Sequence, residues 1–222
     1  MTTYYQEEFP RQLGFMEKVC GAFYQKKLTE RYGEDEAAEI WQSALTELEF
    51  LFARLPPLGG KRNFLTPCLT GTMPALALYK ALQQHDKNPL EAGNIFYDVI
   101  ESTYHDGFFG SREELRQEGK EMFSNESLQQ MESFSAWLQE KEYPENFVYQ
   151  YVPGNGQEFD FGWDFTECAV VKFFSQENAS DLVPFMCAFD FLESKFKKTG
   201  LKRTSTLAEN EPVCDFRYKL EE

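Results

Sequence analysis

The feature that most constrains this chain is a change in the spacing of its apolar residues near Pro144. Before that proline, apolar residues recur every three or four positions, as on one face of an α-helix. From residue 146 onward they alternate with polar residues, as in a β-strand with one buried face. The sequence therefore predicts an α+β protein with a helical part (1–143) and an antiparallel sheet part (144–222), both within a single domain.

The helical part is predicted to contain several amphipathic helices. Its clearest stripe lies in residues 34–55 and consists of Ile40, Ala44, Leu45, Leu48 and Leu51. Ser111 followed by Glu114 resembles a capping box at a helix start. The other predicted helices cover residues 7–33, 70–85, 88–105, 111–123 and 125–139.

The sheet part is predicted to run strand–strand–helix–strand–strand. The strands are expected at residues 146–154, 158–174, 201–208 and 212–220, with a helix over 179–200. Phe161 and Trp163 share one face of the second strand, whereas Asp164 lies on the other. Cys214 and Asp215 are consecutive in the last strand, so a regular strand points them to opposite faces.

The acidic charge of the chain limits the classes of molecule that it is expected to bind. The formal net charge is −15 and the pI is about 4.7, which disfavours nucleic acids and anionic membrane surfaces. A small anionic molecule would need a local cation in its pocket. No apolar run approaches the roughly 20 residues that span a bilayer, and the N-terminal residues lack the features of a signal peptide. A cytoplasmic location is therefore expected.

Cysteine and histidine usage favours thiols over disulfides or a metal site. The chain has five cysteines, and an odd count in a cytosolic protein favours free thiols. It has no C-x-x-C, no close Cys/His pair and no glycine-rich phosphate loop, so neither a metal nor a cofactor is predicted. His85 is expected to be exposed, which leaves His105 as the one ready imidazole base.

The sheet part holds the best candidate site. Cys187 and Asp190 are three residues apart and project from one side of the predicted helix. Cys168 lies late in the second strand, and Cys214 and Asp215 lie in the last. The plainer alternative is that the cysteines are small buried residues and the aspartates are solvated. Asp190 fits that alternative poorly because its neighbours are apolar.

The last 55 residues contain a recognisable pattern. A cysteine closes a strand, a C-x-x-D helix follows an acidic linker, an arginine–threonine strand comes next, and C-D-F-R-Y ends the pattern. These motifs are Cys168, Cys187 with Asp190, Arg203 with Thr206, and Cys214-Asp215-Phe216-Arg217-Tyr218. The pattern resembles the L-2-amino-thiazoline-4-carboxylic acid hydrolase family. The helical segment 75–102 also looks similar, whereas the stiff, acidic "AENEP" turn departs from the glycines usual in the family.

The resemblance implies a hydrolase that opens a small cyclic amidine or amide bearing a carboxylate. Water adds at the amidine carbon and the ring thiolate is expelled. Asp190 or Asp215 would hold the amidinium, and Arg203 would hold the substrate carboxylate. Cys214 or Cys187 would attack covalently, or an aspartate would activate water. The resemblance places Thr206 and Cys168 with Arg203 as substrate-binding residues, and His105 is added to them as the available imidazole.

Two other functions remain open from the sequence. A similar strand and helix order with scattered cysteines occurs in 4-vinyl-reductase-type domains, which bind small molecules without catalysis. Alternatively, the helices would form an interaction protein whose aromatic sheet supports a homo-oligomer. Convergence of the cysteines, aspartates and Arg203 on one cavity would favour the hydrolase over an interaction protein.

Overall fold

The computed structural model describes residues 3–221, and the contacts of the chain form two compact units. The first unit comprises residues up to Thr103 together with Phe173–Met186. The second comprises Tyr104–Lys172 and the chain from Cys187 onward. Three helices contribute residues to both units. All of the candidate site residues belong to the second unit.

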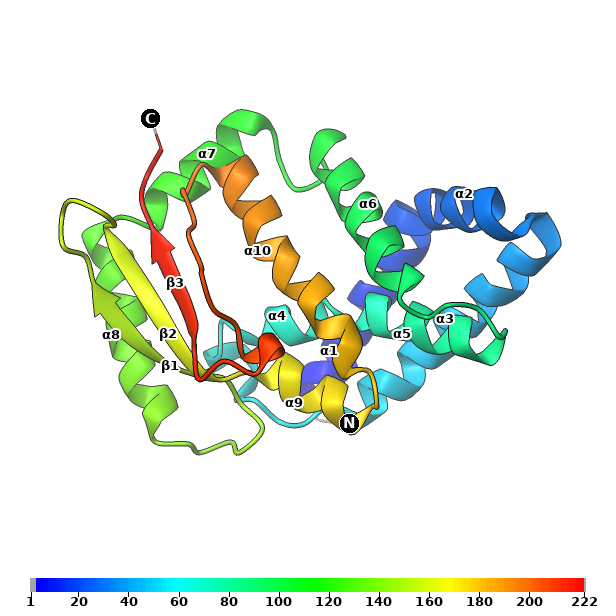
Figure 1. The fold of residues 1–222 in the computed structure, drawn as a ribbon, viewed down its shortest axis with the longest axis horizontal. Helices are drawn as coiled ribbons and strands as arrows, with labels where there is room; N and C mark the ends of the chain where they lie inside the picture. The colour runs from blue at the N-terminus through cyan, green and yellow to red at the C-terminus, as the bar shows by residue number, and fades with distance from the viewer. Residues whose placement is uncertain (1–2, 222) are drawn as a thin grey trace. The chain divides into compact units, whose positions relative to one another are not determined.

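The first unit is helical (Figure 1). Its elements are α1 (Thr3–Gly14), the π-helical segment η1 (Phe15–Cys20), α2 (Gly21–Tyr32), α3 (Glu34–Arg54), η2 (Gly60–Arg62), α4 (Thr66–Thr70), α5 (Met73–Gln84), most of α6 (Glu91–His105) and η3 (Ser180–Leu182). The predicted apolar stripe of α3 is buried at Ile40, Ala44, Leu48 and Leu51, and α3 packs on α5. Residues 10–55 contain no strand, as predicted.

The second unit combines helices with the sheet. It contains α7 (Arg112–Glu121), α8 (Asn125–Gln139), β1 (Val148–Pro153), β2 (Phe161–Glu167), the start of α9 (Ala169–Gln176), most of α10 (Val183–Lys197), η4 (Leu207–Glu209) and β3 (Cys214–Tyr218). The capping box of α7 is present, because Ser111 Oγ accepts from Glu114 N and the Glu114 carboxylate accepts from Ser111 N. The predicted α+β class is confirmed.

The three strands form an antiparallel sheet in the order β1-β2-β3. Phe165 pairs with Cys214 and Trp163 with Phe216, so these four residues share one face. That face is aromatic and largely buried. Asp164 pairs with Asp215 on the opposite face, which is polar. Cys214 and Asp215 therefore lie on opposite faces of β3, as the strand period requires.

Helix α8 runs along the β1 side of the sheet (Figure 1). Its side chains form hydrogen bonds with backbone groups on the outer edge of β1. Ser135 Oγ and Gln139 Nε2 both donate to Tyr149 O, each at 2.9 Å. Tyr151 N donates to Ser135 Oγ at 3.1 Å. Side chains of a helix thus take the place of a further strand at this edge.

The second predicted strand was too long. The sequence favoured a strand over 158–174, but β2 ends at Glu167 and α9 begins at Ala169. In that stretch Ala169, Val170, Phe173 and Phe174 are buried at a helical spacing that the alternating aromatics before it had obscured.

The predicted strand over 201–208 is reduced to an isolated bridge between Lys202 and Arg217. Beyond that bridge the Asp215 carboxylate accepts from the backbone N–H groups of Thr204 and Ser205, at 2.8 and 2.7 Å. Ser205 Oγ donates to Val213 O. Because side chains satisfy the groups that a ladder would use, the strand does not continue.

Candidate functional site

Arg203 lies directly after the bridge at Lys202 and turns inward, with 4% of its side chain exposed. Its Nη1 donates to Asp190 Oδ2 at 2.5 Å, and its Nη2 donates to Cys187 O at 2.9 Å. Lys202 is exposed, so the two neighbouring cations point to different sides. Arg203 thereby connects the chain before η4 to the C-x-x-D segment of α10.

Two phenylalanine rings enclose the Arg203 guanidinium. Its central carbon lies 5.0 Å from the Phe191 ring centroid and 4.8 Å from that of Phe216. Both distances allow a cation–π interaction, and the rings restrict the motion of the guanidinium. Phe191 follows Asp190 on α10, and nothing in the sequence alone indicated that it belongs to the site.

Asp190 presents a carboxylate that is fixed on one side and open on the other. Oδ2 is bound by Arg203, whereas Oδ1 accepts no hydrogen bond from the described residues. The side chain is 38% exposed. Burial of its surroundings raises the pKa of the Asp190 carboxyl to about 6, and the Arg203 guanidinium opposes that rise without cancelling it. This carboxyl can therefore gain and lose a proton close to neutral pH.

Three cysteines lie close enough to Asp190 to interact with it electrostatically: Cys168, Cys187 and Cys214. Burial raises the pKa of the Cys168 and Cys187 thiols to about 12. Burial also raises the pKa of Cys214, although Leu207 N donates to its sulfur at 3.2 Å. All three groups are therefore thiols near neutral pH, and none is a ready nucleophile.

Asp215 and Thr206 support the backbone rather than this cluster. Burial opposes ionisation of Asp215, but hydrogen bonds from Thr204 and Ser205 outweigh it and lower the pKa of Asp215 to about 2. Thr206 is buried and caps η4, because its Oγ1 accepts from Glu209 N. Both side chains hold the segment that follows Arg203.

His105 is exposed at the end of α6, and its ring meets Phe196 edge-on at 5.1 Å. None of the contacts within residues 3–221 joins it to Asp190 or the three cysteines. The structure thus brings together Cys168, Cys187, Asp190, Arg203 and Cys214. Asp215 interacts electrostatically with Cys214 but lies on the opposite face of β3, and Thr206 and His105 lie elsewhere in the second unit.

A family model described as L-2-amino-thiazoline-4-carboxylic acid hydrolase matches residues 70–218, about two thirds of the chain. The chain belongs to this family. Comparisons with curated proteins and with solved structures found no match. The match includes every candidate residue from His105 to Asp215.

Residues 3–221 contain neither a cluster suited to a metal ion nor a membrane-spanning helix. No group of three or more His, Cys, Asp or Glu side chains there is arranged to hold a metal ion. No helix in that range is long and apolar enough to cross a membrane.

One group of residues near the hydrolase family motifs was missed from the sequence. Five of the nine residues between positions 195 and 203 are lysine or arginine, in a chain with a net charge of −15. This basic run was a visible signal, yet only Arg203 was singled out because it matched a family motif. Several of the other cations line a hollow in the second unit.

Proposed function

We propose that this protein is a hydrolase that opens a small cyclic amidine or amide bearing a carboxylate, with L-2-amino-thiazoline-4-carboxylate as the substrate to test first. The observation that carries the proposal is the Asp190 carboxylate, which Arg203 holds by one oxygen while the other oxygen stays open. Membership in the hydrolase family supports the class of reaction.

Asp190 is assigned as the general base. A general base works best when its pKa lies near the operating pH, and the pKa of Asp190 is raised to about 6 by burial. The pKa values of Cys168 and Cys187 are raised to about 12, so covalent attack by either would first need a strong base. Activation of water by Asp190 is therefore favoured over a thiol nucleophile.

The proposed reaction is balanced by one water molecule. Asp190 takes a proton from the water as its oxygen bonds to the amidine carbon. As the new hydroxyl becomes a carbonyl, its proton passes to the ring nitrogen and the ring carbon–sulfur bond breaks. The sulfur leaves as a thiolate and takes the proton held by Asp190. The product from L-2-amino-thiazoline-4-carboxylate is N-carbamoyl-cysteine. Arg203 is assigned to position Asp190, because its guanidinium already binds that carboxylate.

The test compares Asp190→Asn with Asp164→Asn. Asp164 provides a matched control because it is bound by Arg217 at 2.7 Å in the same unit. We expect Asp190→Asn to lower kcat/KM by about 100-fold or more, the usual contribution of a general base. Asp164→Asn should stay close to wild type. N-carbamoyl-cysteine is quantified by mass spectrometry, so that protein thiols do not interfere.

The pH profile gives a second readout. The carboxylate form of Asp190 is the base, so kcat/KM should fall as the pH drops through about 6 and level off above it. Cys187→Ser and Cys214→Ser should retain more activity than Asp190→Asn. Loss of all turnover in either serine variant would favour covalent catalysis. Binding of the substrate without turnover by wild type would favour a non-catalytic binding module.

A further inference from the structure

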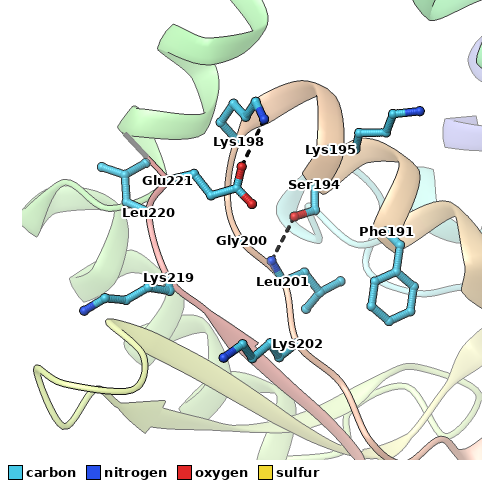
Figure 2. Close-up of a pocket in the computed structure, with 10 residues that line it drawn as sticks. All are labelled: Phe191, Ser194, Lys195, Lys198, Gly200, Leu201, Lys202, Lys219, Leu220 and Glu221. Atoms are coloured by element: carbon cyan, nitrogen blue, oxygen red, sulfur yellow. Dashed lines mark hydrogen bonds and ion pairs between the residues drawn. The ribbon is translucent and has the colours of Figure 1, made fainter.

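The second unit contains a hollow of about 430 Å³ between the end of α10 and the end of β3 (Figure 2). Its volume falls in the range of small-molecule sites. Phe191, Leu201 and Leu220 contribute apolar surface to it, and 43% of Phe191 is exposed. The hollow does not include Asp190 or any of the cysteines.

The walls of this hollow are basic. Lys195, Lys198, Lys202 and Lys219 line it, and an adjoining smaller recess that shares Lys198 adds Arg116 and Lys120. Glu221 is the one acidic residue among the described residues that line the two. Such a concentration of positive charge is the reverse of the chain as a whole, whose net charge is −15.

The positive charge of the hollow is only partly compensated. Lys198 binds Glu221 and Lys219 binds Asp160, each at 3.1 Å. Lys202 is exposed, and its ammonium has no ion-pair partner within residues 3–221. In Figure 2, Lys195 and Lys219 extend outward on opposite sides of the hollow. The Lys202 ammonium is therefore available to pair with a bound anion.

The floor of the hollow is a structured turn. Ser194 Oγ is buried and accepts from Thr199 Oγ1 and from Leu201 N, both at 2.9 Å. Gly200 adopts the left-handed region, with φ of 59°, and allows the turn to lie against the end of β3. The hydrogen bonds of this turn therefore fix the backbone that carries Leu201 and Lys202.

We propose that this hollow binds a small organic anion with one carboxylate on an apolar body. The apolar part would lie against Phe191 and Leu201, and the carboxylate would meet the Lys202 ammonium. Both contacts are needed, because an exposed lysine alone provides weak, screened attraction. The proposal concerns a site separate from Asp190 and does not depend on the hydrolase activity.

The experiment titrates the full-length protein with benzoate, with its uncharged counterpart benzamide and with inorganic phosphate. Binding is followed by amide chemical shifts in NMR spectra. We expect benzoate to shift residues 191–202 and 219–221, benzamide to shift them far less, and phosphate to bind more weakly than benzoate. Raising NaCl from about 0.05 M to about 0.5 M should weaken benzoate binding.

Two variants and one control test the contacts. Lys202→Gln keeps most of the side chain but removes its charge, and should raise the Kd for benzoate by about fivefold to tenfold. Phe191→Ala should weaken benzoate binding and leave phosphate binding unchanged. Lys26→Gln, at an exposed position on α2 in the first unit, should bind benzoate like wild type.

The outcomes separate the proposal from its rivals. No benzoate binding by wild type, shifts confined to residues outside the hollow, or an unchanged Kd in Lys202→Gln would each overturn it. Equal binding of benzoate and benzamide would show an apolar site without charge selection, which also overturns it. Because Lys202 is exposed, its substitution should not unfold the protein even if Phe191→Ala does.

Discussion

At the scale of single residues, Arg203 connects most of the candidate site. It touches Asp190, the backbone of Cys187, and the rings of Phe191 and Phe216. The sequence assigned Arg203 to the site, and its side chain turns inward, whereas the neighbouring Lys202 is exposed. It did not predict that the charge of Arg203 is already balanced by Asp190, because that pairing depends on how α10 packs and not on local spacing.

We expect Arg203→Ala to lower the free energy of unfolding by about 2–4 kcal/mol. The variant removes a buried cation from between two rings and leaves Asp190 without its partner. The cost stays below that of breaking a fully buried pair because 38% of the Asp190 side chain remains exposed. Urea denaturation at neutral pH measures the change.

Arg217→Ala is the control for this prediction. Arg217 pairs with Asp164 on the polar face of the sheet and is 26% exposed, so its removal should cost about 1 kcal/mol or less. Arg203→Lys should recover only part of the loss, because an ammonium lacks the planar shape that stacks between the rings. Equal losses for Arg203→Ala and Arg217→Ala would contradict the structural role given to Arg203.

At the scale of elements, the turn between α10 and the bridge at Lys202 depends on glycine. An added Cβ at Gly200 would lie 2.0 Å from Lys219 O. Gly156 also has positive φ, but a Cβ there would meet nothing within 4 Å. The two glycines therefore share the conformational requirement and differ in the space around them.

We expect Gly156→Ala to cost about 1 kcal/mol, the usual cost of a side chain at positive φ. Gly200→Ala should cost about 1–3 kcal/mol more than Gly156→Ala, because the end of β3 must shift to admit the methyl group. Thermal and urea unfolding of the two variants provide the comparison. A Gly200→Ala variant as stable as Gly156→Ala would show that the turn can move freely.

The sequence predicted elements well wherever one apolar period ran without interruption. The stripe of α3 and the alternation of β2 are examples. The prediction failed where a period changed inside a run, at Cys168 between β2 and α9. It failed again at Thr204 and Ser205, whose backbone N–H groups donate to the Asp215 carboxylate and so do not form the hydrogen bonds of the predicted strand. The spacing of apolar residues does not reveal where a side chain will replace the backbone hydrogen bonds of a sheet.

At the scale of the whole molecule, the cysteines are spread over both units and none is joined in a disulfide. Cys68 is exposed, whereas Cys20 and Cys214 are buried. Burial raises the pKa of Cys20 to about 12, which further slows its reaction with thiol reagents. Cys168 and Cys187 are half-buried, so the five thiols range from exposed to buried.

We expect titration of the unfolded, unreduced protein to detect five thiols. In the folded protein Cys68 should react first, and Cys20 and Cys214 should react only as fast as the structure opens. Cys68→Ser should remove the fast phase alone. Fewer thiols in the unfolded protein would contradict the prediction and indicate a disulfide.

The way α8 closes the edge of β1 affects how copies of this molecule meet. An open strand edge is a template on which another chain can add a strand and start aggregation. Here Tyr149 O and Tyr151 N already bind Ser135 and Gln139, so an incoming strand would have to displace both side chains. The chain is rich in phenylalanine, and its aromatic strands would otherwise favour such pairing. The α8 side chains therefore protect the β1 edge from pairing with a strand of another molecule.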